Sequence, residues 1–368
     1  GLCPPAIMSQ PKVENDTDFL AEPQLLVDTG GERACIIVKA SFELREGPPS
    51  GRDGSFELAP RDRRRPIRSA DVPWGKPEIS SIKYPSDLCV RKPGTDVIVV
   101  AKAHAPGGQP VPSFDAGLKL GRLSKIVRVT GVRVWHREGK GLTQPRPIES
   151  LELRYDHAFG GIDASDPEEI VEDARNPVGR GIARELATLE RQAGPQIESP
   201  YEPITDAGDR PEPVGLGAIG RHWEPRRKLW GSYGGDWVEK RAPLPPRDFD
   251  ERANQCASPG LVATPPLSGG EEGALENLTP GGGTLRFVLP RIQLCLSFLA
   301  KGAEPVRIQP QLDTVLLDTI SVAPAPHVPP GAKAPWSSPL TIEMVYRASI
   351  PAPRRLGELR IHVEELRA

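Results

Sequence analysis

Apolar and polar residues alternate over many short stretches of the chain, and a period of two is typical of β-strands. In the first half, the predicted strands cover residues 34–44, 96–104, 118–120, 124–129, 132–135 and 148–155. In the last third, they cover residues 284–289, 293–298, 306–308, 314–318, 340–348 and 358–363. Gly121 separates two of these strands as a turn residue, which predicts a meander of short antiparallel strands at 118–135.

Helical periodicity is rare by comparison. Residues 182–192 are rich in Ala, Arg, Glu and Leu and are followed by Gly194 and Pro195, which predicts one helix. A second, shorter helix is expected at 248–256, with Asp248 or Asp250 as its N-cap. The chain is therefore expected to be all-β and mainly antiparallel. Sandwich- or barrel-like sheets would bury its strands without open edges.

The pattern divides the chain into four parts. Residues 1–11 are expected to be a tail or a cloning remnant, and residues 1–7 would be the remnant if Met8 is the natural start. Residues 12–154 form an N-terminal β lobe, and residues 267–368 form a C-terminal β lobe. Between them, residues 155–266 form a long irregular segment rich in Gly, Pro and Trp. Residues 9–34 are polar with turn residues, and residues 323–339 are a Pro- and Ala-rich loop, expected to be exposed and mobile.

Charge and cysteine content exclude several classes of protein. The 47 Lys and Arg residues nearly balance the 49 Asp and Glu residues, so no general attraction to nucleic acid or an anionic membrane is expected. No apolar run reaches the roughly 18 residues of a membrane span, and no signal peptide is expected. The five cysteines are widely spaced without a CxxC pair, which favours reduced, packing thiols in a cytoplasmic protein over zinc ligands or disulfides.

Two pairs of residues could carry chemistry. Asp156 and His157 lie side by side, and Asp248 and Asp250 are spaced like a paired-carboxylate site, so a metal-dependent hydrolase using all four is one alternative. The structural interpretation is that the first pair belongs to a turn. In the second pair, the carboxylates would cap a helix and form ion pairs with Arg241, Arg247 or Arg252. The GxGxxG pattern at 215–220 lacks the strand before it and the helix after it that a dinucleotide site needs.

The central segment instead favours recognition by shape. Trp, Tyr and Arg dominate binding hot spots in protein interfaces. The candidate protein-binding residues are Trp223, Arg226, Arg227, Trp230, Tyr233 and Trp237. Part of this set is expected to fill the core of the irregular segment. Because β-sandwiches with exposed tryptophans often bind sugars, a carbohydrate-binding protein is a further alternative.

A series of motifs resembles the DUF2169 family of bacterial proteins. In chain order they are IIVKASFEL (36–44), VRVTGVRVW (127–135), YDHAFGG (155–161), NPVGRG (176–181), GAIGRHWEPR (217–226), GSYGGDW (231–237), LPPRDFDER (244–252), SGGE (268–271), NLTP (277–280) and LDTV (312–315). Their order and spread make residues 12–368 resemble one unit of this family.

The resemblance implies a cytoplasmic adaptor or chaperone of type VI secretion. Family members are thought to load a secreted toxin effector onto the spike, which consists of the valine-glycine-repeat protein and its PAAR-domain tip. No catalysis, metal or cofactor is implied, and neither nucleic acid nor membrane is an expected partner.

Overall fold

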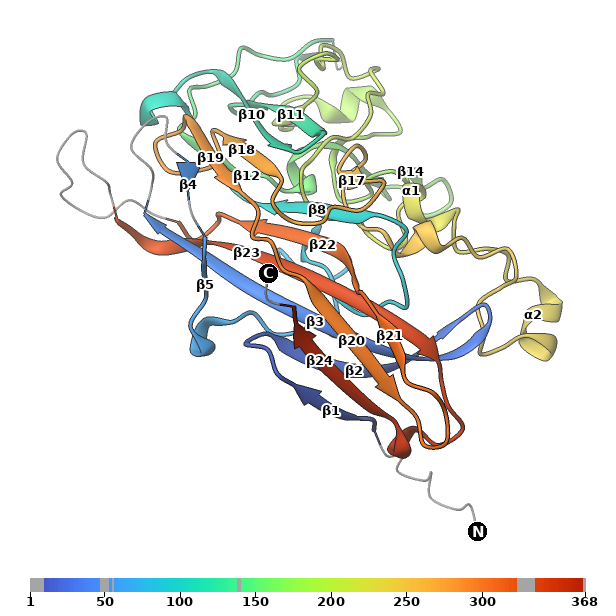
Figure 1. The fold of residues 1–368 in the computed structure, drawn as a ribbon. Coiled ribbons are helices and arrows are strands. Elements are labelled where there is room, and N and C mark those ends of the chain that lie inside the picture. Colours follow the sequence, from blue (N-terminus) through green and yellow to red (C-terminus); the bar gives the residue numbers. More distant parts are fainter. Residues whose placement is uncertain (1–9, 47–52, 55, 138–139, 323–334, 367–368) are drawn as a thin grey trace.

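The structure is a computed structural model that describes residues 10–46, 53–54, 56–137, 140–322 and 335–366 (Figure 1). Strands dominate the described residues, and most neighbouring strands are antiparallel. The all-β prediction is therefore confirmed. Residues 1–9 of the predicted tail and residues 323–334 of the predicted loop lie outside the described residues. The loop prediction is wrong for residues 335–339, which belong to a strand.

A seven-stranded sheet runs through the middle of the molecule (Figure 1). Its strands are, in spatial order, β17 (Val262–Ala263), β8 (Thr95–Val100), β22 (Gln311–Asp318), β23 (Pro335–Pro351), β3 (Gly31–Glu46) and β2 (Leu20–Asp28), with β5 (Glu57–Leu58) also paired to β3. β3 and β23 are its longest strands, with 16 and 17 residues. They form an antiparallel ladder in which Ile36 faces Ala348 and Leu44 faces Leu340. Their apolar residues are buried from Ala34 to Leu44 on β3 and from Leu340 to Ala348 on β23, which explains the unbroken apolar run at the start of β3.

The remaining strands form five smaller sheets. A six-stranded sheet has the order β16 (Ile197–Glu198), β11 (Leu123–Thr130), β10 (Ser113–Leu120), β18 (Glu272–Glu276), β19 (Thr284–Val288) and β4 (Asp53–Gly54). A four-stranded sheet contains β1 (Lys12–Asn15), β24 (Arg360–Glu365), β20 (Leu294–Leu299) and β21 (Val306–Ile308). The other three are β14 (Val171–Asp173) with β13 (Phe159–Asp163) and β15 (Arg180–Gly181), β12 (Ser150–Glu152) with β9 (Lys102–His104), and β6 (Val72–Pro73) with β7 (Ile82–Tyr84).

Helices are few and short. The described residues contain two α-helices, α1 (Glu224–Arg227) and α2 (Gly235–Lys240), neither of which approaches the length of a bilayer crossing. The 3₁₀ turns are η1 (Arg61–Arg63), η2 (Pro106–Gly108), η4 (Tyr155–His157), η5 (Leu186–Leu189), η6 (Glu251–Asn254) and η7 (Leu356–Glu358).

Most strand predictions are confirmed, although the strand expected at 96–104 is divided into β8 and β9, and β1, β13 and β18 were not predicted. β2 was missed because residues 9–34 look polar, although Leu20–Asp28 pairs along its whole length with β3. The predicted strand at 132–135 is wrong, because Val134 and Trp135 form only isolated bridges. The strand expected at 148–155 shortens to β12, and Tyr155 starts a 3₁₀ turn instead.

The helix predicted at 182–192 is also wrong. Only Leu186–Leu189 is helical, as the single 3₁₀ turn η5. The apolar residues of this segment pack around Trp135 and Phe159 in a small second core that includes Ala183 and Leu189. Arg191 has a positive φ of 65°, which ends any helix there. Tertiary packing has therefore overridden a favourable helix propensity.

One large core joins the main sheets. Its buried residues come from the seven-, six- and four-stranded sheets together. The two segments expected as separate lobes contribute neighbouring strands to common sheets, since β3 pairs with β23, β8 with β22 and β1 with β24. The N- and C-terminal regions thus share one core, to which the central segment also contributes residues such as Tyr155 and Trp223.

A group of charged side chains is buried beside the ladder of β3 and β23. Lys39 Nζ lies 2.7 Å from Asp87 Oδ2 and 2.8 Å from Glu343 Oε2, and it also donates to the carbonyl of Pro66 at 2.9 Å. Arg68 forms a second, short ion pair with Glu343. Burial alone would raise the pKa of Glu343, but the charges of Lys39 and Arg68 outweigh it and hold the pKa below its usual value. Glu343 therefore stays ionised inside the protein.

This group predicts a large cost for removing one charge. Lys39→Met leaves Asp87 and Glu343 buried with one cation fewer, so we expect the free energy of unfolding in urea to fall by about 3–5 kcal/mol. Lys119→Met is the matched control, because Lys119 lies on β10 with an exposed side chain and should change the free energy by less than about 0.5 kcal/mol. Equal small effects in both variants would contradict a structural role for the buried lysine.

Candidate protein-binding site

The central segment is held in place by an aromatic pair. Tyr155 and Trp223 are both buried, with ring centroids 5.2 Å apart and planes at 83°. Two glycines of the GxGxxG pattern lie against these rings. A Cβ on Gly215 would lie 2.8 Å from the Tyr155 ring, and one on Gly220 would lie 2.4 Å from Trp223 Nε1. The glycines are thus required for close packing, a role unrelated to a phosphate.

The motifs YDHAFGG and NPVGRG pack against each other and are joined by hydrogen bonds. Asn176 is fully buried, and its Nδ2 donates to the carbonyls of Tyr155 and Phe159 at 2.9 and 2.8 Å. Gly160 has a φ of +137°, and a Cβ there would lie 2.2 Å from the carbonyl oxygen of Asn176. These motif residues specify backbone shape rather than a reactive group.

Two of the candidate binding residues belong to this interior. Trp223 is 6% exposed and Arg226 is 7% exposed. Arg226 donates through Nε and Nη2 to the carbonyl of Ala253 and through Nη1 to the carbonyl of Ile219, all at 3.0–3.1 Å. Both side chains therefore join α1 to its surroundings and are inaccessible to a partner.

The other candidates lie on or beside a projecting loop, residues 231–248, which we call the arm. It extends past the body of the molecule and carries α2 (Figure 1). Its two ends are tied together, because the backbone N and Oγ of Ser232 donate to Asp248 at 3.0 and 2.8 Å. Gly231 has a φ of +82° and leaves no room for a Cβ beside Asp248 and Phe249.

Further contacts stiffen the arm and fix its direction. Trp237 Nε1 donates to the carbonyl of Leu244 at 2.9 Å. Arg241 donates to the carbonyl of Pro245 and, at 2.5 Å, to the carbonyl of Thr29 in the turn between β2 and β3. The arm is thus attached both to its own base and to the end of the large sheet.

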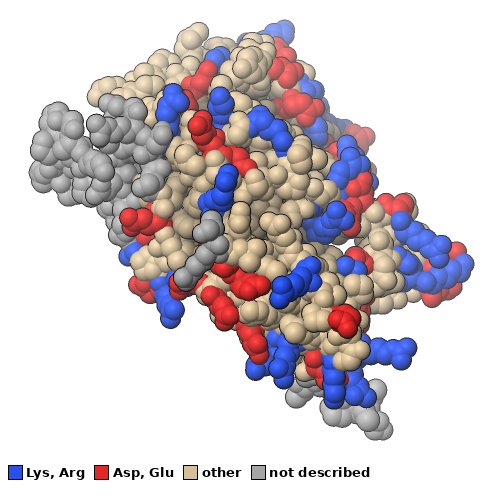
Figure 2. All heavy atoms as spheres, in the orientation of Figure 1, with Lys and Arg blue, Asp and Glu red and all other residues tan. Residues whose placement is uncertain are grey.

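The outer surface of the arm is partly apolar. Tyr233 is 54% and Val238 is 68% exposed, while Trp237 is half-buried with its ring 4.8 Å from that of Tyr233. Acidic and basic side chains are interspersed over the visible face of the molecule, including the arm (Figure 2). The tip therefore combines aromatic, apolar and charged groups, as an interface does.

Two candidates flank the base of the arm. Trp230 is half-buried, with its ring centroid 5.5 Å from that of Phe249 and the Arg221 guanidinium 4.7 Å away. Arg227 is exposed and forms only a surface ion pair with Glu224. The accessible members of the predicted set are therefore Arg227, Trp230, Tyr233 and Trp237.

The first candidate pair for hydrolysis is engaged in local structure. Asp156 accepts hydrogen bonds from Arg154 Nη2 at 2.9 Å and from Ser81. Burial would raise the pKa of Asp156, but these hydrogen bonds lower it. Burial and the positive charge of Arg180 lower the pKa of His157 to about 4, so its imidazole is neutral at pH 7.

The second pair also has structural partners. Asp248 closes the base of the arm through Ser232, and Asp250 caps η6 by accepting from the backbone N of Arg252 at 2.9 Å. The role of Asp250 as a cap and its ion pair with Arg252 are confirmed, but the helix predicted at 248–256 is only the 3₁₀ turn η6. Within the described parts of the chain, no group of three His, Cys, Asp or Glu side chains is placed to hold a metal ion. The carbohydrate alternative rests on exposed tryptophans, and no tryptophan side chain that the structure describes is exposed.

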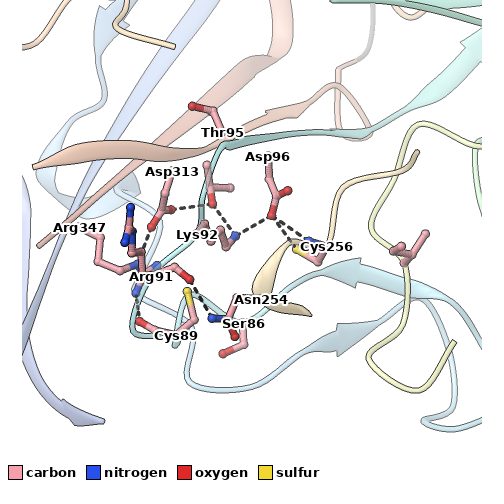
Figure 3. A network of polar contacts seen from close by, with 12 residues as sticks. Ser86, Cys89, Arg91, Lys92, Thr95, Asp96, Asn254, Cys256, Asp313 and Arg347 are labelled. Carbon is pink, nitrogen blue, oxygen red and sulfur yellow. Dashed lines mark hydrogen bonds and ion pairs between the residues drawn. The ribbon is translucent and has the colours of Figure 1, made fainter. Parts of the chain in front are cut away.

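A series of buried polar contacts at the end of the large sheet was not predicted from the sequence (Figure 3). Lys92 Nζ donates to Asp96 and Thr314, both at 2.8 Å. Thr314 donates to Asp313, which accepts from Arg347 Nε at 2.5 Å. Burial would lower the pKa of both cations, but Asp96 and Asp313 raise the pKa values of Lys92 and Arg347 above their usual range. The only sequence indication is the presence of charged residues within apolar strands.

The packing around the aromatic pair predicts a clear glycine effect. Gly220→Ala should destabilise the protein by about 1–3 kcal/mol, because the new methyl group overlaps the Trp223 indole. Gly234→Ala is a control with no atom within 4 Å of the added Cβ and an ordinary negative φ of −73°. Thermal unfolding followed by tryptophan fluorescence would measure both. Equal midpoints for the two variants would contradict this account of the GxGxxG pattern.

Comparison with known proteins gives one match. A family model described as an uncharacterized protein conserved in bacteria, DUF2169, matches residues 29–322. No curated protein and no solved structure matches the chain. Since the matched residues make up most of the sequence and contain both the aromatic pair and the arm, the chain belongs to the DUF2169 family.

Proposed function

We propose that the protein is a non-catalytic cytoplasmic adaptor that binds a type VI secretion effector and helps to load it onto the spike. The arm is the observation that carries this proposal. It offers aromatic and apolar side chains to solvent on a loop whose ends are tied together, which suits recognition of another protein.

The shape of the arm favours binding without large rearrangement. Three hydrogen bonds hold it: Ser232 to Asp248 at the base, the Trp237 indole to the carbonyl of Leu244 within the arm, and Arg241 to the carbonyl of Thr29 at the end of the large sheet. A loop that is ordered before binding loses less conformational entropy when its partner arrives. Tyr233 and Val238 then act as anchors, while Trp230 and Arg227 extend the surface toward the body of the protein.

The partner proposed here is the toxin effector, with the valine-glycine-repeat protein or its PAAR-domain tip as the acceptor of the loaded complex. This assignment rests on the resemblance between the motifs of this chain and those of the family.

The four described cysteines are free, and burial raises the pKa values of Cys35 and Cys256 to about 11 and 12. Unreactive thiols of this kind are compatible with the reducing cytoplasm.

The proposal predicts which variant loses the partner. Tyr233→Ala combined with Val238→Asp should weaken capture of the effector encoded beside this protein by roughly 30-fold or more, since each change removes an exposed anchor. The folded core should be unaffected, because neither side chain contributes to it. Affinity would be measured by biolayer interferometry with the purified effector.

Tyr201→Ala is the matched control, because Tyr201 is 86% exposed and lies outside the arm. It should leave the affinity within about twofold. Arg227→Glu tests the charged edge of the same surface and should cause a smaller loss, which added salt reduces further. Equal binding by the wild type and the double variant would contradict the role of the arm, and absence of any complex with the wild type would contradict the adaptor proposal.

A further inference from the structure

A cavity of about 280 Å³ opens at the end of the large sheet, beside the polar chain of Figure 3. It is formed where the starts and ends of several strands meet. The lining comprises Arg33, Val90, Arg91, Lys92, Ile308, Gln309, Gln311, Asp313, Arg347, Ala348 and Ser349. Its volume is near the lower limit for ligand pockets, which suits a small molecule or a single side chain of a partner.

The lining has an excess of positive charge. Four of its residues are cations, Arg33, Arg91, Lys92 and Arg347, and Asp313 is its only carboxylate. Each cation has a carboxyl neighbour, but those of the other three, Asp28, Glu251 and Asp96, lie outside the lining. The pairs of Arg33 and Arg91 are loose, at 3.5 and 3.6 Å. Arg33 Nη2 also donates to Ser349 at 3.4 Å, and both guanidinium groups keep further donors available for another anion.

One buried donor at this cavity lacks an acceptor. The side chain of Arg347 is only 3% exposed. Its Nε binds Asp313 and its Nη1 donates to the carbonyl of Cys89 at 2.8 Å, while Nη2 has no hydrogen-bond partner among the described residues. An unsatisfied charged donor is costly inside a protein, and a bound anion would remove this cost.

We infer that this cavity is a binding site for a carboxylate. Planar guanidinium groups bind carboxylates through paired N–H donors, which lysine-only sites cannot do. The rim residues Gln309 and Ser349 supply further polar groups for the oxygen atoms or for the atoms next to them. The carboxylate can belong to a small organic acid or to an acidic group of a protein partner, and both present the same chemistry.

The position of the cavity connects it to the arm. Arg33 follows the turn at Thr29, which holds the arm through Arg241. On the other side, Asn254 of η6, just after the arm, donates to the carbonyl of Arg91 at 2.8 Å. The link to a protein partner rests on the proposed function, whereas the carboxylate site itself does not.

Citrate titration tests the site on the full chain. Binding of citrate would be followed by isothermal titration calorimetry at low salt and by thermal shift. We expect Arg91→Gln to weaken citrate binding roughly three- to tenfold, because it removes one charge-assisted contact at the rim. Gln309→Glu, which places a negative charge at the same rim, should weaken it at least as much. Arg307→Gln is the control, since Arg307 is exposed on the adjacent β21 and does not line the cavity.

The outcomes separate the site from the adaptor proposal. Citrate binding that Arg91→Gln and Gln309→Glu weaken, but Arg307→Gln does not, supports the site. If citrate also displaces the effector, the carboxylate comes from the partner; if it binds without displacement, the ligand is a small organic acid. No citrate binding, or equal weakening by all three substitutions, would overturn the site whatever the effector does.

Discussion

The ladder between β3 and β23, with the charges buried beside it, is the constraint on which the rest of the structure depends. It joins residues near the start of the chain to residues near its end. Lys39 on β3 and Glu343 on β23 form an ion pair across it, and Asp87 and Arg68 bring the intervening segment to the same place. Buried charges tolerate little displacement, because each lost contact leaves an unpaired ion in a medium of low dielectric constant. The ladder thereby fixes the sheet from which both the arm and the basic cavity are positioned.

The irregular segment uses a different kind of constraint. Tyr155 and Trp223 fill its centre, and Gly215 and Gly220 allow the backbone to approach their rings. Asn176 donates hydrogen bonds to the backbone carbonyls of Tyr155 and Phe159 and so joins two motifs of the segment. The most distinctive motifs of the sequence therefore determine the backbone conformation of this segment. The neighbouring loop, residues 231–248, projects outward from it. This close packing explains how a segment with only short helices and short strands can present a defined surface.

The sequence predicted the strands well because burial on one or both faces leaves a visible pattern, as in residues 34–44 and 96–104. It failed where packing decides. Residues 182–192 have helix-forming composition but fold around Trp135. β2, with the sequence LAEPQLLVD, was missed because its apolar residues do not alternate with polar ones and because Pro23 interrupts it. Among the candidate binding residues, Trp223 and Arg226 proved to be interior. Whether a tryptophan or arginine is exposed depends on its neighbours in space, which residue spacing does not reveal. The cavity around Arg347 could not be predicted for the same reason.

The most direct test is hydrogen–deuterium exchange of the protein alone and in the presence of the proposed effector. Exchange should slow in the complex across residues 231–240, with little change in the already protected ladder of β3 and β23. A stable complex whose protected peptides lie elsewhere, with exchange in the arm unchanged, would contradict the claim that the arm is the docking surface.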